Sequence, residues 1–407
     1  MKCRNCSSNL NKMFVDLGTS PPSNSYITKN NLLKKEKKYP LKVFVCENCW
    51  LVQTQDFTKA DQLFDDNYAY FSSTSKSFLN HAKSYALDII DRINLKKESL
   101  VIEVASNDGY LLKNFLERKI PCLGIEPTKS TADFAKSIGI PVIKDFFSSK
   151  LADKLLDDGI SADLICGNNV YAHVPNINDF TLGLKKILKK SGTITLEFPH
   201  ILQLIKFNQF DTIYHEHFSY LSLYAVNAIF KKFDLRIYRV EELGVHGGSL
   251  RIYGCHNDHS IKTEDSFVYI LKKEILFGIN RINIYEDFQK KVKLTSQNFL
   301  NFLNSEHNYG KKIAAYGAAA KGNTILNYLN IKDDKIMFVC DAAKSKQNKY
   351  MPGSHIPILS PEQILIDKPD FVIIFPWNLS TEIKNQLEYI REWGGKFVVA
   401  IPELKIL

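Results

Sequence analysis

The sequence lacks the long hydrophobic runs of a secreted or membrane-bound chain. None of its 407 residues lies in a window near the roughly 18 to 20 apolar residues that span a bilayer. Met1, Lys2 and Cys3 are not followed by the apolar segment of a signal peptide. These absences predict a cytoplasmic protein that does not use a membrane. In a reducing compartment, its eight cysteines are expected to be metal ligands or buried side chains rather than disulfides.

Concentrated basic charge is lacking too. The 53 Lys and Arg exceed the 44 Asp and Glu, but the lysines are scattered in short runs such as residues 34–38. A nucleic-acid surface concentrates basic residues and interleaves aromatic ones, so no nucleic-acid partner is expected. The modest positive charge favours an anionic small molecule instead. A monomer is compatible with this composition, which leaves the oligomeric state open.

Strand-like and helix-like segments alternate twice along the chain. In the first region, strands are expected at 100–104, 122–125, 141–143, 162–166 and 192–197, with helices between them. In the second, strands are expected at 313–317, 336–340, 371–375 and 396–401. This alternation predicts an α/β fold with a central doubly wound Rossmann-like domain at 75–255 and a C-terminal Rossmann-like domain at 308–407. A small N-terminal module at 1–74 and a helical connector at 256–307 complete the chain.

Four cysteines form two pairs, Cys3-x-x-Cys6 and Cys46-x-x-Cys49. A C-x-x-C turn presents two thiolates on one knuckle, and two knuckles complete a tetrahedral zinc site. Four protein ligands leave no open position on the metal. The pattern therefore predicts a structural Zn²⁺ in the N-terminal module.

A loop of small and polar residues, 103–110, follows the first strand of the central domain. In a doubly wound sheet, such a loop lies in the ligand crevice, and an acidic residue about 20 positions later can accept ribose hydroxyls. Because the loop lacks the full G-x-G-x-x-G pattern, it predicts S-adenosylmethionine (SAM) rather than a dinucleotide. The expected cofactor-binding residues are Glu103, Ser106, Asn107, Asp108, Gly109, Tyr110, Glu126, Pro127, Asp145, Phe146, Asn168 and Asn169.

A dense set of proton-transfer groups occurs at Tyr214, His215, Glu216 and His217. Forming a carbon–carbon bond beside a carbonyl requires a base with a pKa near the working pH, which histidine provides. The motif lacks the i, i+4 histidine pair of a zincin. A metal role for the two histidines and a buried structural role both stay open. Further candidates are His173, after the fourth strand, and the tyrosines of residues 68–73, which could form a lid.

Two turns of the C-terminal domain are further candidates for ligand binding. Residues 315–324 form a small-residue turn that contains Lys321 and Asn323, a form suited to holding phosphate at a helix N-terminus. Residues 375–378 end a later strand and include Trp377, an aromatic platform. A simple turn before a helix is the alternative interpretation.

Together these motifs resemble the sugar C-methyltransferases that act on nucleotide-linked 4-keto-6-deoxyhexoses, the dTDP-sugar C-3 methyltransferase family. The likeness includes the cysteine knuckles, Asp16-Leu17-Gly18 with the segment ending near Asn24, the 103–109 loop, residues 214–220 and the 316–324 turn. It implies that His217 removes a proton from the sugar carbon. The remaining catalytic residues that it implies are Glu216, Tyr214, Tyr70 and His173. The substrate-binding residues that it implies are Tyr70, His173, Tyr214, Lys321, Asn323 and Trp377.

The activity expected from this resemblance is SAM-dependent methylation of the carbon beside the keto group, at C3 as in the family. The partner would be a nucleotide-linked keto sugar, with dTDP, GDP and CDP all open. Two alternatives remain at this point: an O-methyltransferase acting on a nucleotide sugar, and a non-catalytic zinc-bearing protein that binds nucleotides.

Overall fold

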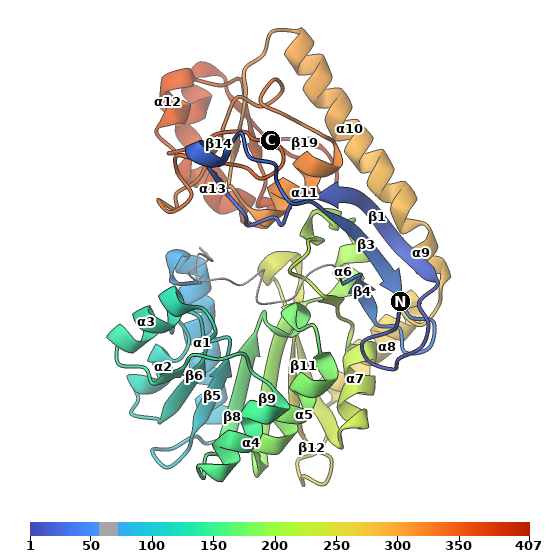
Figure 1. Cartoon of the computed structure of the whole chain (residues 1–407), viewed down its shortest axis with the longest axis vertical. Helices are drawn as coiled ribbons and strands as arrows, with labels where there is room; N and C mark the ends of the chain where they lie inside the picture. Colours follow the sequence, from blue (N-terminus) through green and yellow to red (C-terminus); the bar gives the residue numbers. More distant parts are fainter. Residues whose placement is uncertain (57–71) are drawn as a thin grey trace.

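The computed structural model describes residues 1–56 and 72–407. Figure 1 shows two α/β regions stacked along the long axis of the molecule. They are joined along one side by strands β1 (Lys12–Ser20) and β3 (Tyr39–Val45) and by the long helix α10 (Phe288–Asn308). The N-terminal strands therefore bridge both α/β regions.

The central region is built on a seven-stranded sheet. Its strands are β5 (Val101–Val104), β6 (Cys122–Ile125), β7 (Val142–Ile143), β8 (Ala162–Asn168), β9 (Leu188–Pro199), β11 (Leu235–Leu243) and β12 (Ser249–His256). The order is β11-β12-β9-β8-β5-β6-β7, and the five predicted strands run parallel. The antiparallel hairpin of β11 and β12 is not predicted from the sequence, because Arg236, Arg239 and Arg251 interrupt its apolar pattern.

Helices cover both faces of this sheet. They are α1 (Lys76–Arg92), α2 (Lys113–Leu116), α3 (Lys129–Ser137), α4 (Ser149–Asp157), α5 (Ile177–Ile187), α6 (Ile201–Lys206) and α7 (Leu223–Lys232). One hydrophobic cluster lies beneath α4, α5 and α7, and a separate cluster lies beneath α1, α2 and α3. Coverage of both faces explains why most residues of the central strands β5 and β8 are buried.

The C-terminal region has its own six-stranded sheet. Its strands are β13 (Ile313–Tyr316), β14 (Val339–Cys340), β16 (Ile358–Leu359), β17 (Phe371–Ile374), β18 (Lys396–Val399) and β19 (Lys405–Ile406). The order is β16-β14-β13-β17-β18-β19, with only β19 antiparallel among the described strands. Its helices are α11 (Ala320–Tyr328), α12 (Gln363–Asp367) and α13 (Ser380–Gln386).

Strands of the N-terminal module pair with strands of both other regions. Its sheet is β1-β3-β4-β10, in which β4 (Val52–Thr54) pairs with β10 (Ser219–Tyr220) from the central region. Strand β2 (Ile27–Thr28) pairs with β15 (Lys349–Tyr350) from the C-terminal region. Backbone pairing over such sequence separations ties the three regions together.

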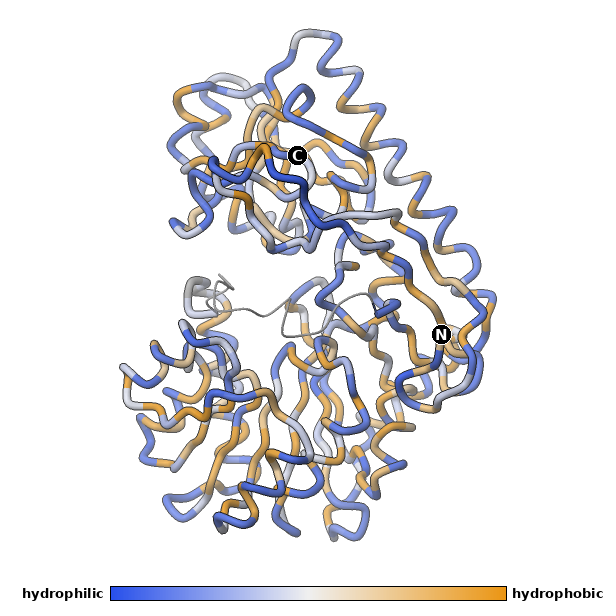
Figure 2. The backbone as a smooth tube through the Cα atoms, in the orientation of Figure 1, coloured by the Kyte–Doolittle hydropathy of each residue, from blue (hydrophilic) through white to orange (hydrophobic). Residues whose placement is uncertain are grey.

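The helical connector expected at 256–307 is divided into three helices. Helix α8 (Asp265–Phe277) packs on α7 and β11, and it ends at Gly278, which adopts a φ of +98°. Helix α9 (Asn283–Glu286) and helix α10 then run along β1. Figure 2 shows hydrophilic and hydrophobic residues alternating along α10, whose buried face includes Val292, Phe299 and Leu303.

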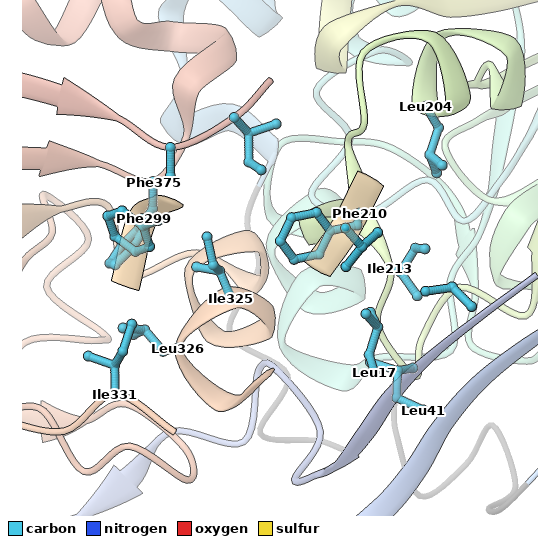
Figure 3. Packing of buried hydrophobic residues seen from close by; sticks show 14 of the residues in the cluster. Leu17, Leu41, Leu204, Phe210, Ile213, Phe299, Ile325, Leu326, Ile331 and Phe375 are labelled. Carbon is cyan, nitrogen blue, oxygen red and sulfur yellow. The ribbon is translucent and has the colours of Figure 1, made fainter. Parts of the chain in front are cut away.

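One hydrophobic cluster is shared by the N-terminal module, the C-terminal region and the segment 201–213. In Figure 3, Phe299 and Ile325 lie on the C-terminal side of this cluster, and Phe210 extends from the central region towards them. Leu17 of β1 and Leu41 of β3 lie beneath Ile213. The residues that precede the Tyr214–His217 motif are therefore part of a shared core.

None of the helices in the described parts of the chain is both long and apolar enough to cross a membrane. This finding agrees with the low content of hydrophobic runs in the sequence.

Candidate active site and zinc site

The four paired cysteines converge at one point of the N-terminal module. Their Sγ atoms all lie within 4.8 Å of one another. The Sγ–Sγ distance is 3.5 Å both for Cys3 with Cys49 and for Cys6 with Cys46. Tetrahedral Zn–S bonds of about 2.3 Å place sulfur atoms about 3.8 Å apart, so the cluster fits this metal. It is the one cluster with metal-ligand geometry among the described residues.

The loop after β5 has a backbone that few residue types tolerate. Ala105, Asn107 and Gly109 have φ values of +57°, +50° and +79°. A Cβ atom on Gly109 would collide with the side chain of Ile140. This backbone conformation places peptide N–H and C=O groups at the carboxyl end of β5. A doubly wound sheet binds its ligand at that end.

Glu126 ends β6 beside this loop. Its Oε2 accepts a hydrogen bond from the backbone N–H of Asn107 at 2.9 Å, and its Oε1 accepts one from Thr128 at 2.9 Å. Burial raises the pKa of Glu126, while the two backbone donors lower it. The carboxylate is therefore held at the end of the strand, where ribose hydroxyls can reach it.

Several buried polar atoms at this edge have no hydrogen-bond partner among the described residues. They are both Oε atoms of Glu103, Oγ of Ser106, and one Oδ1 each on Asp108, Asn168 and Asn169. Burial raises the pKa of Glu103 well above its usual range, and the carboxylates of Asp108 and Glu126 raise it further. Buried polar groups are normally paired, so this edge is suited to a ligand with a positive charge and several polar groups. The α-amino group, sulfonium and ribose of SAM meet these requirements.

The turn at Ser72–Thr74, just before α1, is hydrogen-bonded to the same loop. The backbone N–H of Ser72 donates to Oδ1 of Asn107 at 2.9 Å, and that of Ser73 donates to Oδ2 of Asp108 at 3.0 Å. Tyr110 stacks on Phe78 of α1 at 5.0 Å between ring centroids. The predicted catalytic residue Tyr70 lies outside the described residues.

Three of the predicted cofactor residues lie towards the surface. Pro127 is half-buried after β6. Asp145 and Phe146 are exposed after β7, and Oδ1 of Asp145 accepts a hydrogen bond from the backbone N–H of Phe146. Asp145 and Phe146 follow β7, the edge strand next to β6, so they lie at the edge of the sheet.

His217 is 6% exposed and has a defined orientation. Its Nδ1–H donates to the carbonyl oxygen of Thr212 at 3.0 Å. Because a neutral imidazole carries one proton, this hydrogen bond leaves Nε2 with a free lone pair. Burial holds the pKa of His217 well below its usual range, and His173 lowers it further. The ring is therefore neutral and able to accept a proton at Nε2.

Aromatic and imidazole rings surround His217. The ring centroid of Tyr214 lies 4.0 Å from that of His217, and those of His173 and Tyr220 lie at 4.7 and 6.0 Å. His173 follows β8, and its Nδ1–H donates to the carbonyl oxygen of Glu216 at 2.8 Å. Burial lowers the pKa of His173 to about 4. The structure thus joins the end of β8 to the Tyr214–His217 motif.

Glu216 faces the N-terminal module. Its Oε2 accepts a hydrogen bond from Nδ2 of Asn24 at 2.6 Å. Burial raises the pKa of Glu216 to about 7, against the lowering effect of Asn24. Nearby, the Tyr26 hydroxyl donates to the carbonyl oxygen of Ala318 in the C-terminal turn at 2.6 Å. Residues 24–26 therefore connect the motif with the C-terminal region.

His215 and His217 have different environments despite their proximity in sequence. His215 donates from Nε2 to the carbonyl oxygen of Tyr39 at 3.1 Å, and its ring packs against that of Tyr39. It therefore holds the motif against β3. Each of the two histidines is bonded to a different backbone carbonyl, which supports the structural interpretation for His215 rather than a shared metal site.

The C-terminal turn meets the central region at Lys321. Its Nζ donates to Oδ1 of Asn378 at 2.5 Å and lies 4.2 Å from the centroid of the Trp377 ring. The Trp377 indole donates to Oδ2 of Asp211 at 2.7 Å. Burial lowers the pKa of Lys321 to about 8, and burial raises that of Asp211 to about 6. A buried lysine next to an aromatic face is suited to an anionic ligand.

Asn323 has a structural contact that its sequence position does not predict. Its Nδ2 donates to the carbonyl oxygen of Ser23 at 2.6 Å, while its buried Oδ1 has no partner within the described ranges. Sequence reasoning also missed Asp211, which belongs to no motif. In the sequence, Asn24 only marks the end of a segment, and no catalytic or binding role is predicted for it.

Comparison with known proteins identifies the family. Family models match three consecutive parts of the chain: a zinc binding domain at 3–64, a methyltransferase domain at 78–240 and a C-methyltransferase C-terminal domain at 244–402. The chain is also 30% identical to C-methyltransferase NovU of Streptomyces niveus over 406 residues, covering 100% of this chain and 96% of that protein. The chain belongs to the C-methyltransferase family.

Solved structures are more distant from this C-methyltransferase. The magnesium protoporphyrin IX methyltransferase of Synechocystis PCC 6803 is 12% identical with a TM-score of 0.37, covering 44% of this chain and 83% of that one. A SAM-dependent methyltransferase of Anabaena variabilis is 16% identical with a TM-score of 0.37, covering 49% and 96%. The family match, with the loop after β5 and the cysteine cluster, establishes a SAM-dependent C-methyltransferase with an N-terminal zinc site.

Gly109 tests the donor loop of this C-methyltransferase. Gly109→Ala adds a Cβ where φ is +79° and where Ile140 leaves no space, so the affinity for S-adenosylhomocysteine (SAH) should fall at least about tenfold, measured by calorimetry. Gly244→Ala is the matched control, because Gly244 has a φ of −77° and open space around it. Equal affinities of the two variants would place the donor elsewhere.

Cys49 tests the zinc site. Cys49→Ser removes one of four thiolates and should reduce bound zinc well below roughly one ion per chain, with a lower melting temperature, as measured by elemental analysis and calorimetry. Cys340→Ser is the control, since Cys340 is buried elsewhere and its Sγ donates to the carbonyl oxygen of Ser360, as a hydroxyl also can. Full zinc content in the Cys49 variant would contradict the assignment.

Proposed function

We propose that this C-methyltransferase methylates a nucleotide-linked 4-keto-6-deoxy sugar at the carbon beside the keto group, C3. Three features support this acceptor: the similarity to sugar C-methyltransferases in the motifs, a histidine able to act as a base in the Tyr214–His217 motif, and a buried lysine in the C-terminal turn. A hydrogen on a carbon next to a carbonyl is acidic enough for a positioned imidazole to remove.

The observation that carries this proposal is the tautomer of His217. Its Nδ1–H is engaged by the Thr212 carbonyl at 3.0 Å, so Nε2 is the atom available to take a proton. The low pKa of the buried ring keeps this nitrogen unprotonated at neutral pH. His217 therefore acts as the base that takes the proton from the sugar carbon, and the carbon becomes the nucleophile.

The groups around His217 orient the sugar and stabilise the charge that develops on it. Tyr214 and His173 lie against the His217 ring. Glu216, held by Asn24, accepts a hydrogen bond from a sugar hydroxyl when it is ionised. Tyr70 belongs to the same set by its resemblance to the family motif.

The end of β5 and its neighbours hold the methyl donor. The residues that we assign to this task are Glu103, Ser106, Asn107, Asp108, Gly109, Tyr110, Glu126, Pro127, Asn168 and Asn169, with Asp145 and Phe146 at the rim. Glu103 and Asp108 provide carboxyl oxygens without a described partner for the amino group, whose positive charge favours their ionised forms, and Glu126 takes the ribose hydroxyls. SAM supplies the methyl group as an electrophile that needs no further activation.

The C-terminal turn holds the nucleotide. Lys321, with Trp377 beneath it, offers a positive charge to the diphosphate. Asn323 lies one turn into α11, and its Oδ1 is buried without a partner among the described residues. A lysine that is buried but charged attracts an anion more strongly than an exposed one, because water screens it less.

Deuterium exchange tests the proposed reaction. The wild-type enzyme with SAH and a 4-keto-6-deoxy sugar linked to dTDP, GDP or CDP should exchange the hydrogen beside the keto group in deuterated water, as measured by NMR. His217→Asn should lower this exchange at least about 100-fold, because the base is lost. Affinity for SAH should be unchanged.

The exposed His307 provides a control, since His307→Asn removes an imidazole at the end of α10 and should leave the exchange intact. No exchange and no gain of a methyl group by any of the three sugars would count against the acceptor. Methyl transfer without exchange would indicate transfer to oxygen.

Lys321 gives a pH test of acceptor binding. Since its pKa is lowered to about 8, the side chain is charged below this pH and neutral above it. The affinity for the nucleotide sugar should therefore be high at pH 7 and fall as the pH rises through 8, measured by calorimetry. Lys321→Gln should bind more weakly at pH 7 and lose this alkaline decrease. An unchanged decrease in the variant would assign the titration to another group.

A further inference from the structure

A histidine lies at the tip of the β11–β12 hairpin in an unfavourable backbone conformation. His246 has a φ of +54°, and Gly247 and Gly248 after it have φ values of +86° and +113°. Left-handed backbone costs a residue with a side chain on the order of 1 kcal/mol or more, and glycine or asparagine would adopt it more readily. Strained backbone of this kind clusters at active sites and ligand-binding segments.

This tip lies between the donor loop and the C-terminal turn. The His246 ring centroid is 5.8 Å from that of Phe78, which also stacks on Tyr110 of the donor loop. On the opposite side, Gly247 lies so close to Trp377 that a Cβ atom there would collide with the indole ring. His246 is therefore at the point where the proposed methyl donor and nucleotide sites approach each other.

The imidazole has an unsatisfied polar atom at this position. Nε2 of His246 is buried and has no hydrogen-bond partner within residues 1–56 and 72–407. Burial and the nearby charge of Lys321 hold the pKa of His246 at about 4, with Glu197 acting against them and His81 with them. The ring is neutral at physiological pH, so one nitrogen carries a proton and can donate it in a hydrogen bond.

Two polar side chains near the tip, Glu197 and Gln209, take part in hydrogen bonds with described residues. Glu197 accepts hydrogen bonds from His81 at 2.9 Å and Arg251 at 2.6 Å. Gln209 donates to the carbonyl oxygen of Gly247 at 2.8 Å, which fixes the backbone of the turn. The turn is thus held rigidly, while the side chain that it presents is left without a described partner at Nε2.

We propose that His246 binds the acceptor substrate, with its Nε2–H donating a hydrogen bond to the keto oxygen beside the methylated carbon. This inference rests on the proposed function. When the carbon loses its proton to Nε2 of His217, the electron pair of the C–H bond moves into the enolate, and negative charge develops on the keto oxygen. The carbon then bonds to the methyl group as the C–S bond breaks, and the thioether of SAH leaves. His246 transfers no proton in these steps.

A donor that is already oriented stabilises the enolate more than the ketone, because the hydrogen bond strengthens as charge accumulates on oxygen. Its effect should appear in kcat rather than in the KM of the acceptor. A neutral imidazole is suited to this task, since it donates without adding a buried positive charge next to Lys321.

Two substitutions separate this function from a purely structural turn. His246→Asn suits the left-handed backbone best, but its shorter amide does not reach the position of Nε2. His246→Gln is less suited to this backbone, but it can place an N–H near that position. We expect kcat to fall about 100-fold in the Asn variant, with KM within about threefold of wild type, and the Gln variant to recover about tenfold of this loss.

Affinity for SAH and the melting temperature should be nearly unchanged in both variants, and His307→Asn serves again as the control. Wild-type kcat in the Asn variant, or a higher kcat for Asn than for Gln, would overturn the proposal. A shared loss of melting temperature and SAH affinity would mark a structural turn and overturn it as well. Failure of the proposed function is distinguishable, because the wild-type enzyme itself would then show no exchange with any keto sugar.

Discussion

The hydrogen bond from His217 to the Thr212 carbonyl depends on the path of residues 212–220 through the junction of all three regions. Thr324 of α11 donates to the carbonyl oxygen of Ile213 at 2.9 Å, and Thr54 of β4 donates to that of His217 at 3.2 Å. His215 is bonded to β3, and β10 pairs with β4. The segment that carries the proposed base is therefore held from three directions, so its imidazole has little freedom to rotate.

Because of this arrangement, the zinc site affects the active site as well as the stability of its own module. The knuckle Cys46–Cys49 connects β3 with β4, and β4 is the strand that pairs with β10. A metal that fixes the knuckle also fixes the register of the sheet that ends at the Tyr214–His217 motif. The module is thus part of the scaffold of the active site. Its four cysteine ligands leave no open coordination position, so the metal itself has a structural role.

Electrostatics follows from the same burial. His173, His217 and Lys321 all have pKa values below their usual range, and Glu216 has one above it, because each lies away from water. The pKa values of Glu216 and Lys321 thus move towards neutral pH, whereas the two histidines stay neutral there. Glu216 and Lys321 can therefore change protonation at a small cost, since their charged and neutral forms are close in free energy.

Local patterns in the sequence predicted much of this molecule. The five parallel strands of the central sheet and the cysteine cluster follow from periodicity and spacing, because residues within one turn or strand determine them. The hairpin of β11 and β12 did not, since its buried charged residue Arg251 pairs with Glu197, 54 residues away in sequence. Because they are close in the sequence, His215 and His217 were expected to have similar roles. Their side chains are hydrogen-bonded to different backbone carbonyls, those of Tyr39 and Thr212.

The sequence by itself determined which residues can bind zinc, which loop suits SAM and which segment contains an imidazole base. Only the tertiary structure decided which histidine of that segment has a free Nε2, and that Asn24, Asp211 and His246 lie beside the proposed site. The reason is physical: the placement of Asn24 and Asp211 depends on contacts between residues more than 150 positions apart, Asn24 with Glu216 and Asp211 with Trp377. The orientation of His217 depends on the folded turn that brings its ring to the Thr212 carbonyl. Periodicity and local propensity contain no information about such contacts.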